Sequence, residues 1–485
     1  MPKEYDYNTP LSDILMMPDG NTINHTNLEI ILKEEILVFC ENKSVQKFRI
    51  MPFKSLYNAH NNFWRKDKNW EFFFTKEMLD KLKEKNIIER VVKKQEEAKE
   101  EKEVKQEESS PPKPVIDQGF GDDYKAIVAM TNADKVKYLN DIKIKMDELI
   151  SRKTKDKPTV TKAMVTNTRD AVMINHSALK NAFDLGDVEA KKSTQSLVFT
   201  THEMVKSYIH LVTQDVLDDD LMTRLVERSN GTIVQHMTRV YLNGIAFLAF
   251  YNNFVSNRTA IINMRKTLNA KYRQYYQNLL PYIDIDDIVL ERVFQKGMIA
   301  VPPELFVKWA VGFLIHDVGK VDHVQYHEGE ASYERSIVIE HVKVGYNAVI
   351  NKTNYPKEAT LITGYHHEYY GNPEGYGYYR EHLEHYQKNN PQIRPEYCIT
   401  FDLDSILDCH ALAYFPAKIL EIVDIYDSIT DPNRVYRKAL NTDAALSMMR
   451  EEFITKSLKI DPLLFELFRS FIKRNKAIAD HSQTY

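Results

Sequence analysis

The chain has 485 residues, a length that predicts two or three domains. Of these residues 43% are hydrophobic and 28% are charged, a composition typical of a folded, soluble protein. Its formal net charge of −4 provides no positive field, so we expect neither a nucleic acid nor an anionic membrane as a partner. The three cysteines show no pairing pattern, and the N-terminus is charged, so we do not expect a secreted protein with a disulfide framework. No apolar run reaches the roughly 20 residues that a membrane-spanning helix needs. We therefore expect a cytoplasmic protein.

Residues 1–92 are expected to form a small α+β regulatory or interaction domain that binds a protein partner of unknown identity. Short apolar runs at 36–39 and 72–74 predict strands, and 78–88 has the spacing of a helix. Residues 93–118 carry dense mixed charge and almost no large apolar side chains, so they are predicted to be a flexible linker.

The pattern after the linker predicts a mainly α fold. Segments 136–150, 203–216 and 234–254 place apolar residues at intervals of three and four, and glycine is scarce. We divide this part into a helical segment, 119–204, and a larger domain, 205–485.

The larger domain is rich in histidine: nine of the 16 histidines fall between residues 316 and 410. At 309–315 an apolar stretch runs directly into His316 and Asp317, and Gly319 and Lys320 follow. Imidazole and carboxylate together suit iron, manganese or zinc, and a carboxylate has two oxygens with which to bridge two cations. Taken alone, the pair is equally compatible with a buried histidine capped by its neighbour.

Three further contexts strengthen the metal interpretation. His341 and His366 follow His316 at intervals of 25 residues, and a second histidine, His367, comes directly after His366. Asp424 and Asp427 lie three apart in an apolar helix, where buried carboxylates are costly unless cations or donors compensate them. Each context alone is compatible with a satisfied core histidine or a structural carboxylate. Together they predict successive helices that point into one metal centre.

With these motifs in this order, residues 205–455 resemble the HD-GYP family, bacterial phosphodiesterases of the HD superfamily that open cyclic di-GMP. The family's His-Asp-x-Gly-Lys stands at 316–320, its next histidine with a glycine four residues later at 341–345, and its His-His-Glu at 366–368. The C-terminal signature is similar to 423–430 with 434–439, and 236–240 is similar to the first histidine motif.

The resemblance implies a helical bundle around a centre of two divalent cations. Iron or manganese is favoured, and zinc, magnesium and nickel are also compatible with such ligands. The implied metal ligands are His236, His316, Asp317, His341, His366, His367 and Asp424. Asp317 would bridge the cations, Lys320 would stabilise charge on the phosphate, and Asp427 would orient Lys320. The implied substrate-binding residues are Arg434, Arg437, Gly375 and Tyr376.

Some features depart from the family pattern. Thr232 stands where some members have a glutamate that supplies a third metal, so we expect two cations. The chain is longer than the family norm near 257–300 and 378–412, which we interpret as insertions. The Gly-Tyr-Pro loop is present only as Gly375, Tyr376 and Gly377, a departure in the loop that shapes the substrate pocket and not in the metal ligands.

The expected activity is therefore hydrolysis of cyclic di-GMP to linear pGpG or GMP in bacterial second-messenger signalling. One alternative is a catalytically weak or inactive cyclic di-GMP receptor that signals through residues 1–92. Another is an HD-type hydrolase that acts on a different nucleotide or phosphate ester. Helical segments before such domains often pair, so a homodimer is compatible with the sequence.

Overall fold

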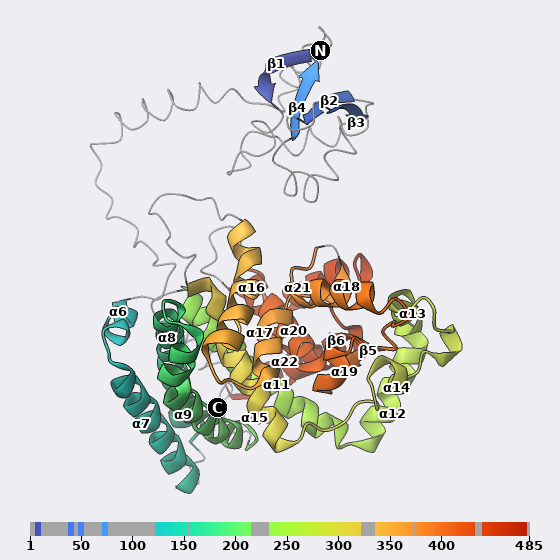
Figure 1. Cartoon of the computed structure of the whole chain (residues 1–485). Helices are drawn as coiled ribbons and strands as arrows, with labels where there is room; N and C mark the ends of the chain where they lie inside the picture. Colours follow the sequence, from blue (N-terminus) through green and yellow to red (C-terminus); the bar gives the residue numbers. More distant parts are fainter. Residues whose placement is uncertain are drawn as a thin grey trace, which may run out of the picture. The chain divides into compact units, whose positions relative to one another are not determined.

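The structure is a computed structural model of the whole chain (Figure 1). It describes residues 5–10, 37–42, 47–52, 70–75, 122–152, 156–214, 232–321, 335–372, 374–431 and 439–482. For the four segments before residue 76, and for 122, 232, 321, 335–338 and 475–482, it describes the backbone alone. The chain divides into two compact units, which are Met1–Pro114 with His327–Glu334, and Val115–Tyr326 with Arg335–Tyr485.

The first unit contains a four-stranded antiparallel sheet. Its strands are β1 (Tyr5–Pro10), β2 (Leu37–Asn42), β3 (Lys47–Pro52) and β4 (Trp70–Thr75), in the order β1-β4-β2-β3. In the register of the central pair, Phe39 lies opposite Phe73. The apolar runs at 36–39 and 72–74 thus overlap β2 and β4, whereas the helix predicted at 78–88 lies outside the described residues.

The second unit is mainly helical, and the prediction of an α fold is confirmed for it. Its first helices are α6 (Asp122–Val128), α7 (Asn132–Ser151), α8 (Lys157–Phe183), α9 (Asp187–Val212) and α11 (Thr232–Val255). The middle helices are α12 (Arg258–Thr267), α13 (Arg273–Leu279), α14 (Leu290–Val293), α15 (Pro303–Ile315), α16 (Arg335–Lys352) and α17 (Lys357–Tyr365). The last are α18 (Tyr379–Asn389), α19 (Leu403–Leu407), α20 (Phe415–Thr430), α21 (Thr442–Arg450) and α22 (Pro462–Ser482).

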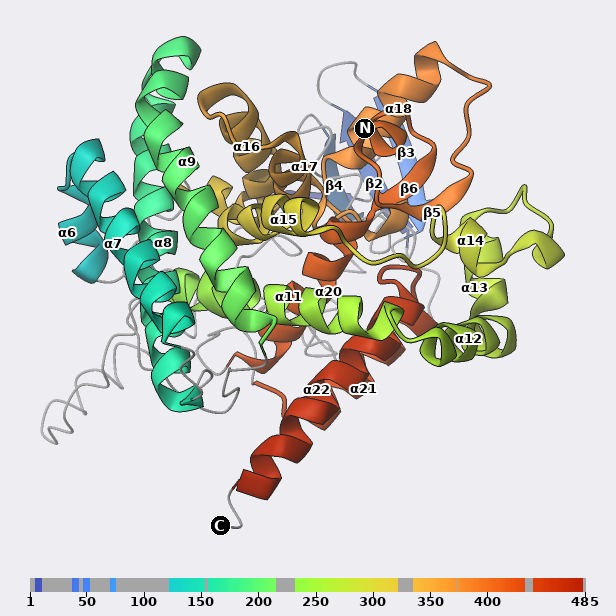
Figure 2. The same ribbon diagram turned by 90° about the horizontal axis from the view of Figure 1, so that it is seen from below.

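Helices α7, α8 and α9 form a layer on one side of this unit, and α12 to α14 lie on the opposite side (Figure 2). Thr131 caps α7 by accepting a hydrogen bond from the backbone N–H of Asp134, which satisfies one of the first unpaired donors of the helix. Leu139, Ile142 and Met146 then recur at helical spacing and are buried. The predicted boundary at residue 204 falls within α9, so α9 runs unbroken from the helical segment into the larger domain.

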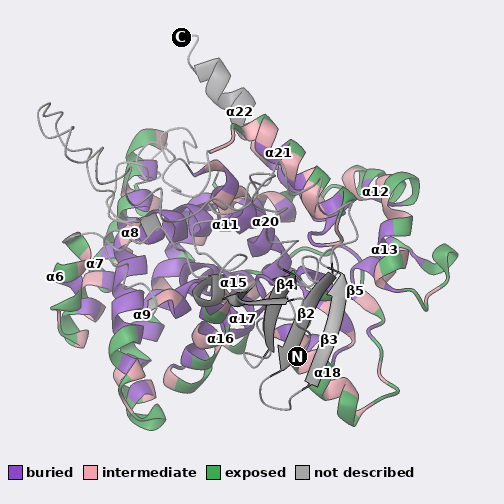
Figure 3. Cartoon of the chain, turned by 90° about the horizontal axis from the view of Figure 1, so that it is seen from above, coloured by how far each residue is buried: buried purple, intermediate pink, exposed green. Residues whose placement is uncertain are grey.

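Helices α11 and α20 lie side by side in the interior and are mainly buried, whereas α12 and α13 carry exposed residues on their outer faces (Figure 3). Helices α15 and α17 pack closely because Gly312 has no side chain: a Cβ there would lie 3.1 Å from the Cα of Ala359. This close approach brings the C-terminal ends of α15 and α17, and hence two histidine motifs, into the same region.

The two predicted insertions pack against each other. Strands β5 (Tyr397–Thr400) and β6 (Ala411–Tyr414) in the second insertion are paired in parallel, and Phe294 of the first insertion bridges to Ile399. The Gln295 N–H donates to the Ile399 carbonyl at 2.9 Å. Both segments are therefore integrated into the second unit.

Among the described helices, none has the length and apolar character needed to cross a membrane.

Candidate metal centre

The seven predicted metal ligands come from five helices and meet in the buried interior. His236 lies on α11, His341 on α16 and Asp424 on α20, while the remaining four follow directly after two helix ends. His316 and Asp317 follow α15, and His366 and His367 follow α17. All seven residues are at most 5% exposed: His236, His316, Asp317, His341, His366, His367 and Asp424. Burying so many ionisable groups together is costly unless they bind one another or a cation.

Gly319 allows the segment after α15 to approach α16. A Cβ at Gly319 would lie 1.8 Å from the backbone oxygen of His341 and 2.5 Å from the backbone nitrogen of Gly345. No side chain fits in that space. The sequence predicts a close approach at Gly345, one turn beyond His341, and the structure shows that Gly319 is the neighbour that comes close to it.

Two groups of three side chains form candidate metal positions. In each group the ligand atoms lie within 4.8 Å of one another. The first group is His236, His316 and Asp424, and the second is His341, His366 and His367.

Asp317 lies between the two groups. Its Oδ2 is 3.3 Å from Nε2 of His236 and 3.5 Å from Nε2 of His316. Its Oδ1 is 3.1 Å from Nε2 of His341 and 3.8 Å from Nε2 of His366. Each carboxylate oxygen therefore faces one group, which is the arrangement that a bridging ligand requires.

Backbone carbonyls orient two of the histidines. Nδ1 of His316 lies 2.9 Å from the carbonyl oxygen of Phe313, and Nδ1 of His366 lies 3.0 Å from that of Thr363. A carbonyl only accepts, so each Nδ1 carries the proton and each Nε2 presents a lone pair to the centre. Both Nε2 atoms are buried and form no hydrogen bond with any residue that the structure describes. Such orphaned acceptors in a buried site fit a metal cation.

His236 is oriented by a carboxylate instead. Its Nδ1 lies 2.7 Å from Oδ2 of Asp427, and its Nε2 lies 2.9 Å from Oδ1 of Asp424. We predicted that Asp427 orients Lys320, but its hydrogen bonds are to His236 and Arg239. Lys320 instead forms an ion pair with Asp317, with its Nζ 2.5 Å from Oδ2.

The electrostatics of the centre reflect its concentration of carboxylates. Burial lowers the pKa of His236, but hydrogen bonds to Asp317, Asp424 and Asp427 outweigh burial and raise this pKa to about 10. For His367, burial dominates and lowers the pKa to about 3. A histidine binds a metal through its neutral imidazole, so His236 would release a proton when a cation binds. The cation would then supply the positive charge that compensates the surrounding carboxylates.

The residues around Gly375 and Tyr376 form a loop against the second group. The backbone N–H groups of Tyr376 and Gly377 both donate to the carbonyl of His367, at 2.9 and 3.1 Å. The Tyr376 ring lies 4.4 Å from the His367 ring at an angle of 32°. A Cβ at Gly375 would lie 2.5 Å from the Glu368 carbonyl oxygen, so the loop can fold this tightly only with glycine there. The other predicted substrate-binding residues, Arg434 and Arg437, lie outside the described residues.

A second buried polar network lies behind this loop and was missed by sequence reasoning. Lys418 donates to Glu421 at 2.5 Å, and its Nζ lies 3.9 Å from the centre of the Tyr370 ring. Burial raises the pKa of Glu368 to about 8 and that of Glu421 to about 7. The only sequence signal was the presence of charged residues within apolar helical stretches.

Sequence reasoning also missed His176 on α8. The Tyr124 hydroxyl lies 3.0 Å from its Nδ1. Burial and the nearby Lys180 lower the pKa of His176 to about 3, against an opposing contribution from Asp317. The helices before residue 205 therefore extend to the edge of the metal centre.

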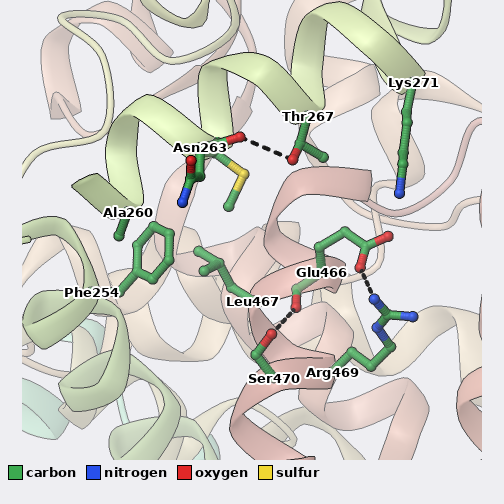
Figure 4. Close-up of a pocket in the computed structure, with 10 residues that line it drawn as sticks. Phe254, Ala260, Asn263, Thr267, Lys271, Glu466, Leu467, Arg469 and Ser470 are labelled. Carbon is green, nitrogen blue, oxygen red and sulfur yellow. Dashed lines mark hydrogen bonds and ion pairs between the residues drawn. The ribbon is translucent and has the colours of Figure 1, made fainter. Parts of the chain in front are cut away.

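A cavity of about 330 Å³ lies between α12 and α22 (Figure 4). Its lining includes Met264, Lys271, Leu467 and Arg469, and it contains none of the predicted metal ligands. Glu466 on its wall forms ion pairs with both Arg469 and Arg450, each at 2.7 Å.

Comparison of the chain with protein-family models, curated proteins and solved structures finds no match. The resemblance to the HD-GYP family therefore rests on the sequence motifs alone.

Proposed function

We propose that the protein is a metal-dependent phosphodiesterase that hydrolyses cyclic di-GMP to linear pGpG or GMP. The observation that carries this proposal is the position of Asp317, with one carboxylate oxygen facing each of two buried ligand groups. Iron or manganese suits these nitrogen and oxygen ligands, and zinc, magnesium and nickel remain compatible with them.

The ligands divide naturally between two cations. His236, His316 and Asp424 would hold one, His341, His366 and His367 would hold the other, and Asp317 would bridge them. Two such cations supply Lewis acidity that activates water and neutralises charge on a phosphate.

The position of Lys320 supports a charge-stabilising role. Its ammonium lies against Asp317 at the edge of the centre, and its side chain is only 15% exposed. From there it would stabilise the negative charge that develops on the phosphate oxygens during attack. The Tyr376 ring, which lies beside His367, would contact the nucleotide, and Arg434 and Arg437 would bind its phosphate or guanine.

One feature favours a second candidate function, a receptor that binds cyclic di-GMP without efficient cleavage. The loop at Gly375, Tyr376 and Gly377 lacks the family's proline, and this loop lies directly on a predicted metal ligand. Lys320 argues for the hydrolase, because a receptor has no need of a charge-stabilising lysine. In either case we place the protein in the cytoplasm, with residues 1–92 as the unit that contacts a partner.

The proposal is tested by assaying protein purified without oxygen and supplied with Mn(II) or Fe(II). Cyclic di-GMP is compared with other cyclic dinucleotides, cyclic mononucleotides and a generic phosphodiester. Preferential cleavage of cyclic di-GMP supports the proposal. Cleavage of another ester alone would move the activity to a different substrate, and tight cyclic di-GMP binding without cleavage would favour the receptor.

A further inference from the structure

A buried arginine lies directly behind the first ligand group. Arg239 follows His236 by three residues on α11, so both side chains project from the same face of the helix. Its side chain is 7% exposed. It therefore occupies the protein interior next to the metal centre without being one of the predicted ligands.

Arg239 grips the carboxylate that orients His236. Its Nε lies 2.5 Å from Oδ1 of Asp427, and its Nη2 lies 3.0 Å from Oδ2. The same Oδ2 is 2.7 Å from Nδ1 of His236. Nη2 also lies 2.8 Å from Asp431, at the C-terminal end of α20. One guanidinium thus joins α11 to a carboxylate within α20 and to the carboxylate of its C-cap residue.

The geometry fixes both oxygens of Asp427. A planar guanidinium binds a carboxylate through two parallel hydrogen bonds, which prevents the carboxylate from rotating. With Asp427 fixed, the Nδ1 proton of His236 is directed at Oδ2 of that carboxylate. Its Nε2 is then directed toward Asp424 and Asp317. Partners that orient a metal-binding histidine in this way typically change metal affinity 10- to 100-fold when removed.

We propose that Arg239 is a positioning residue that sets the metal affinity of the group His236, His316 and Asp424, acting through Asp427. The second group has its own supports, because the backbone carbonyl of Thr363 orients His366. Loss of Arg239 therefore weakens one cation of the pair more than the other. This inference rests on the metal centre of the proposed function but not on the identity of the substrate.

The test is titration of the metal-free full-length protein with Mn(II), with binding measured by calorimetry and by electron paramagnetic resonance. Wild type is expected to bind two ions. Once both are bound, the resonance spectrum should show two magnetically coupled Mn(II) ions. Arg239→Gln should lose about 10- to 100-fold affinity for one ion and keep the other. Arg239→Lys should recover only part of the loss, because lysine supplies the charge without the paired donors.

A double-mutant cycle shows whether the effect passes through Asp427. Once Asp427→Asn is present, adding Arg239→Gln should weaken Mn(II) binding by less than about threefold. The matched control is Arg265→Gln, which removes a two-bond arginine–carboxylate pair with Glu291 that lies elsewhere and is half exposed. Both Mn(II) affinities should be unchanged in that variant.

Thermal unfolding of the metal-free variants separates positioning from folding. A folded Arg239→Gln protein that loses one ion supports the inference. Wild-type affinity for both ions in that variant, equal loss of both ions, or additive effects in the double variant would overturn it. Two bound ions in wild type without cleavage of cyclic di-GMP would remove the proposed activity and leave this inference standing.

Discussion

Substitution of Gly319 by alanine should damage both the fold and the metal centre. The added Cβ would lie 1.8 Å from the His341 carbonyl oxygen, whereas real contacts of this kind are essentially never below 3.0 Å. The backbone must therefore open by at least about 1.2 Å at this point. Overpacking of this kind typically lowers the free energy of unfolding by about 1–3 kcal/mol. We expect Gly319→Ala at the upper end of this range, because the added Cβ meets backbone atoms, which cannot change rotamer.

The same displacement would move Asp317 away from His341. In the wild-type structure, Oδ1 of Asp317 lies 3.1 Å from Nε2 of His341. Metal–ligand distances tolerate only about 0.2 Å, so we expect a loss of at least about tenfold in Mn(II) affinity. The assays are urea unfolding of metal-free protein and Mn(II) titration. Gly186→Ala is the control, because a Cβ there meets nothing within 4 Å, and its stability should change by less than about 1 kcal/mol. A Gly319→Ala protein with wild-type stability and wild-type metal affinity would refute this reasoning.

Three further predictions follow from individual side chains. Asp317→Ala, which removes the bridging carboxylate, should lower both metal content and turnover, and unchanged metal content measured by mass spectrometry would contradict that role. Lys320→Ala should keep two metals and lose about 100-fold or more in kcat, and unchanged steady-state kinetics would count against it. Glu421 has its pKa raised to about 7 by burial, against about 4.5 when unfolded, so the stability it contributes is present below pH 4.5 and is lost as the pH rises through 7. The unfolding free energy of metal-free wild type, relative to Glu421→Gln, should therefore fall by about 3 kcal/mol over that range, and a flat difference would contradict the shift.

The sequence was informative about the fold where the pattern was periodic. Apolar residues at intervals of three and four predicted the helices α7 and α11, because burial of one face dictates that spacing. It could not predict that the two insertions would pair through Phe294 and Ile399, since contacts distant in sequence leave no local periodicity.

For the candidate site, the sequence supplied the residue types and the structure supplies their arrangement. The spacing of His316, His341 and His366 predicted convergence on one centre, and the structure places them around Asp317. The partner of Asp427 was predicted incorrectly, because whether it meets Lys320 or Arg239 depends on how α11 crosses α20. His176 was missed because a single histidine in an apolar helix carries no ligand spacing.

The central claim is a pair of cations bridged by Asp317 that cleave cyclic di-GMP, and one experiment addresses it most directly. Protein purified without oxygen is analysed for metal content and assayed in parallel with cyclic di-GMP and added Mn(II) or Fe(II). We expect about two metals per chain and a linear product. Fewer than two metals at saturation, or two metals with no hydrolysis under any of these conditions, would contradict the claim.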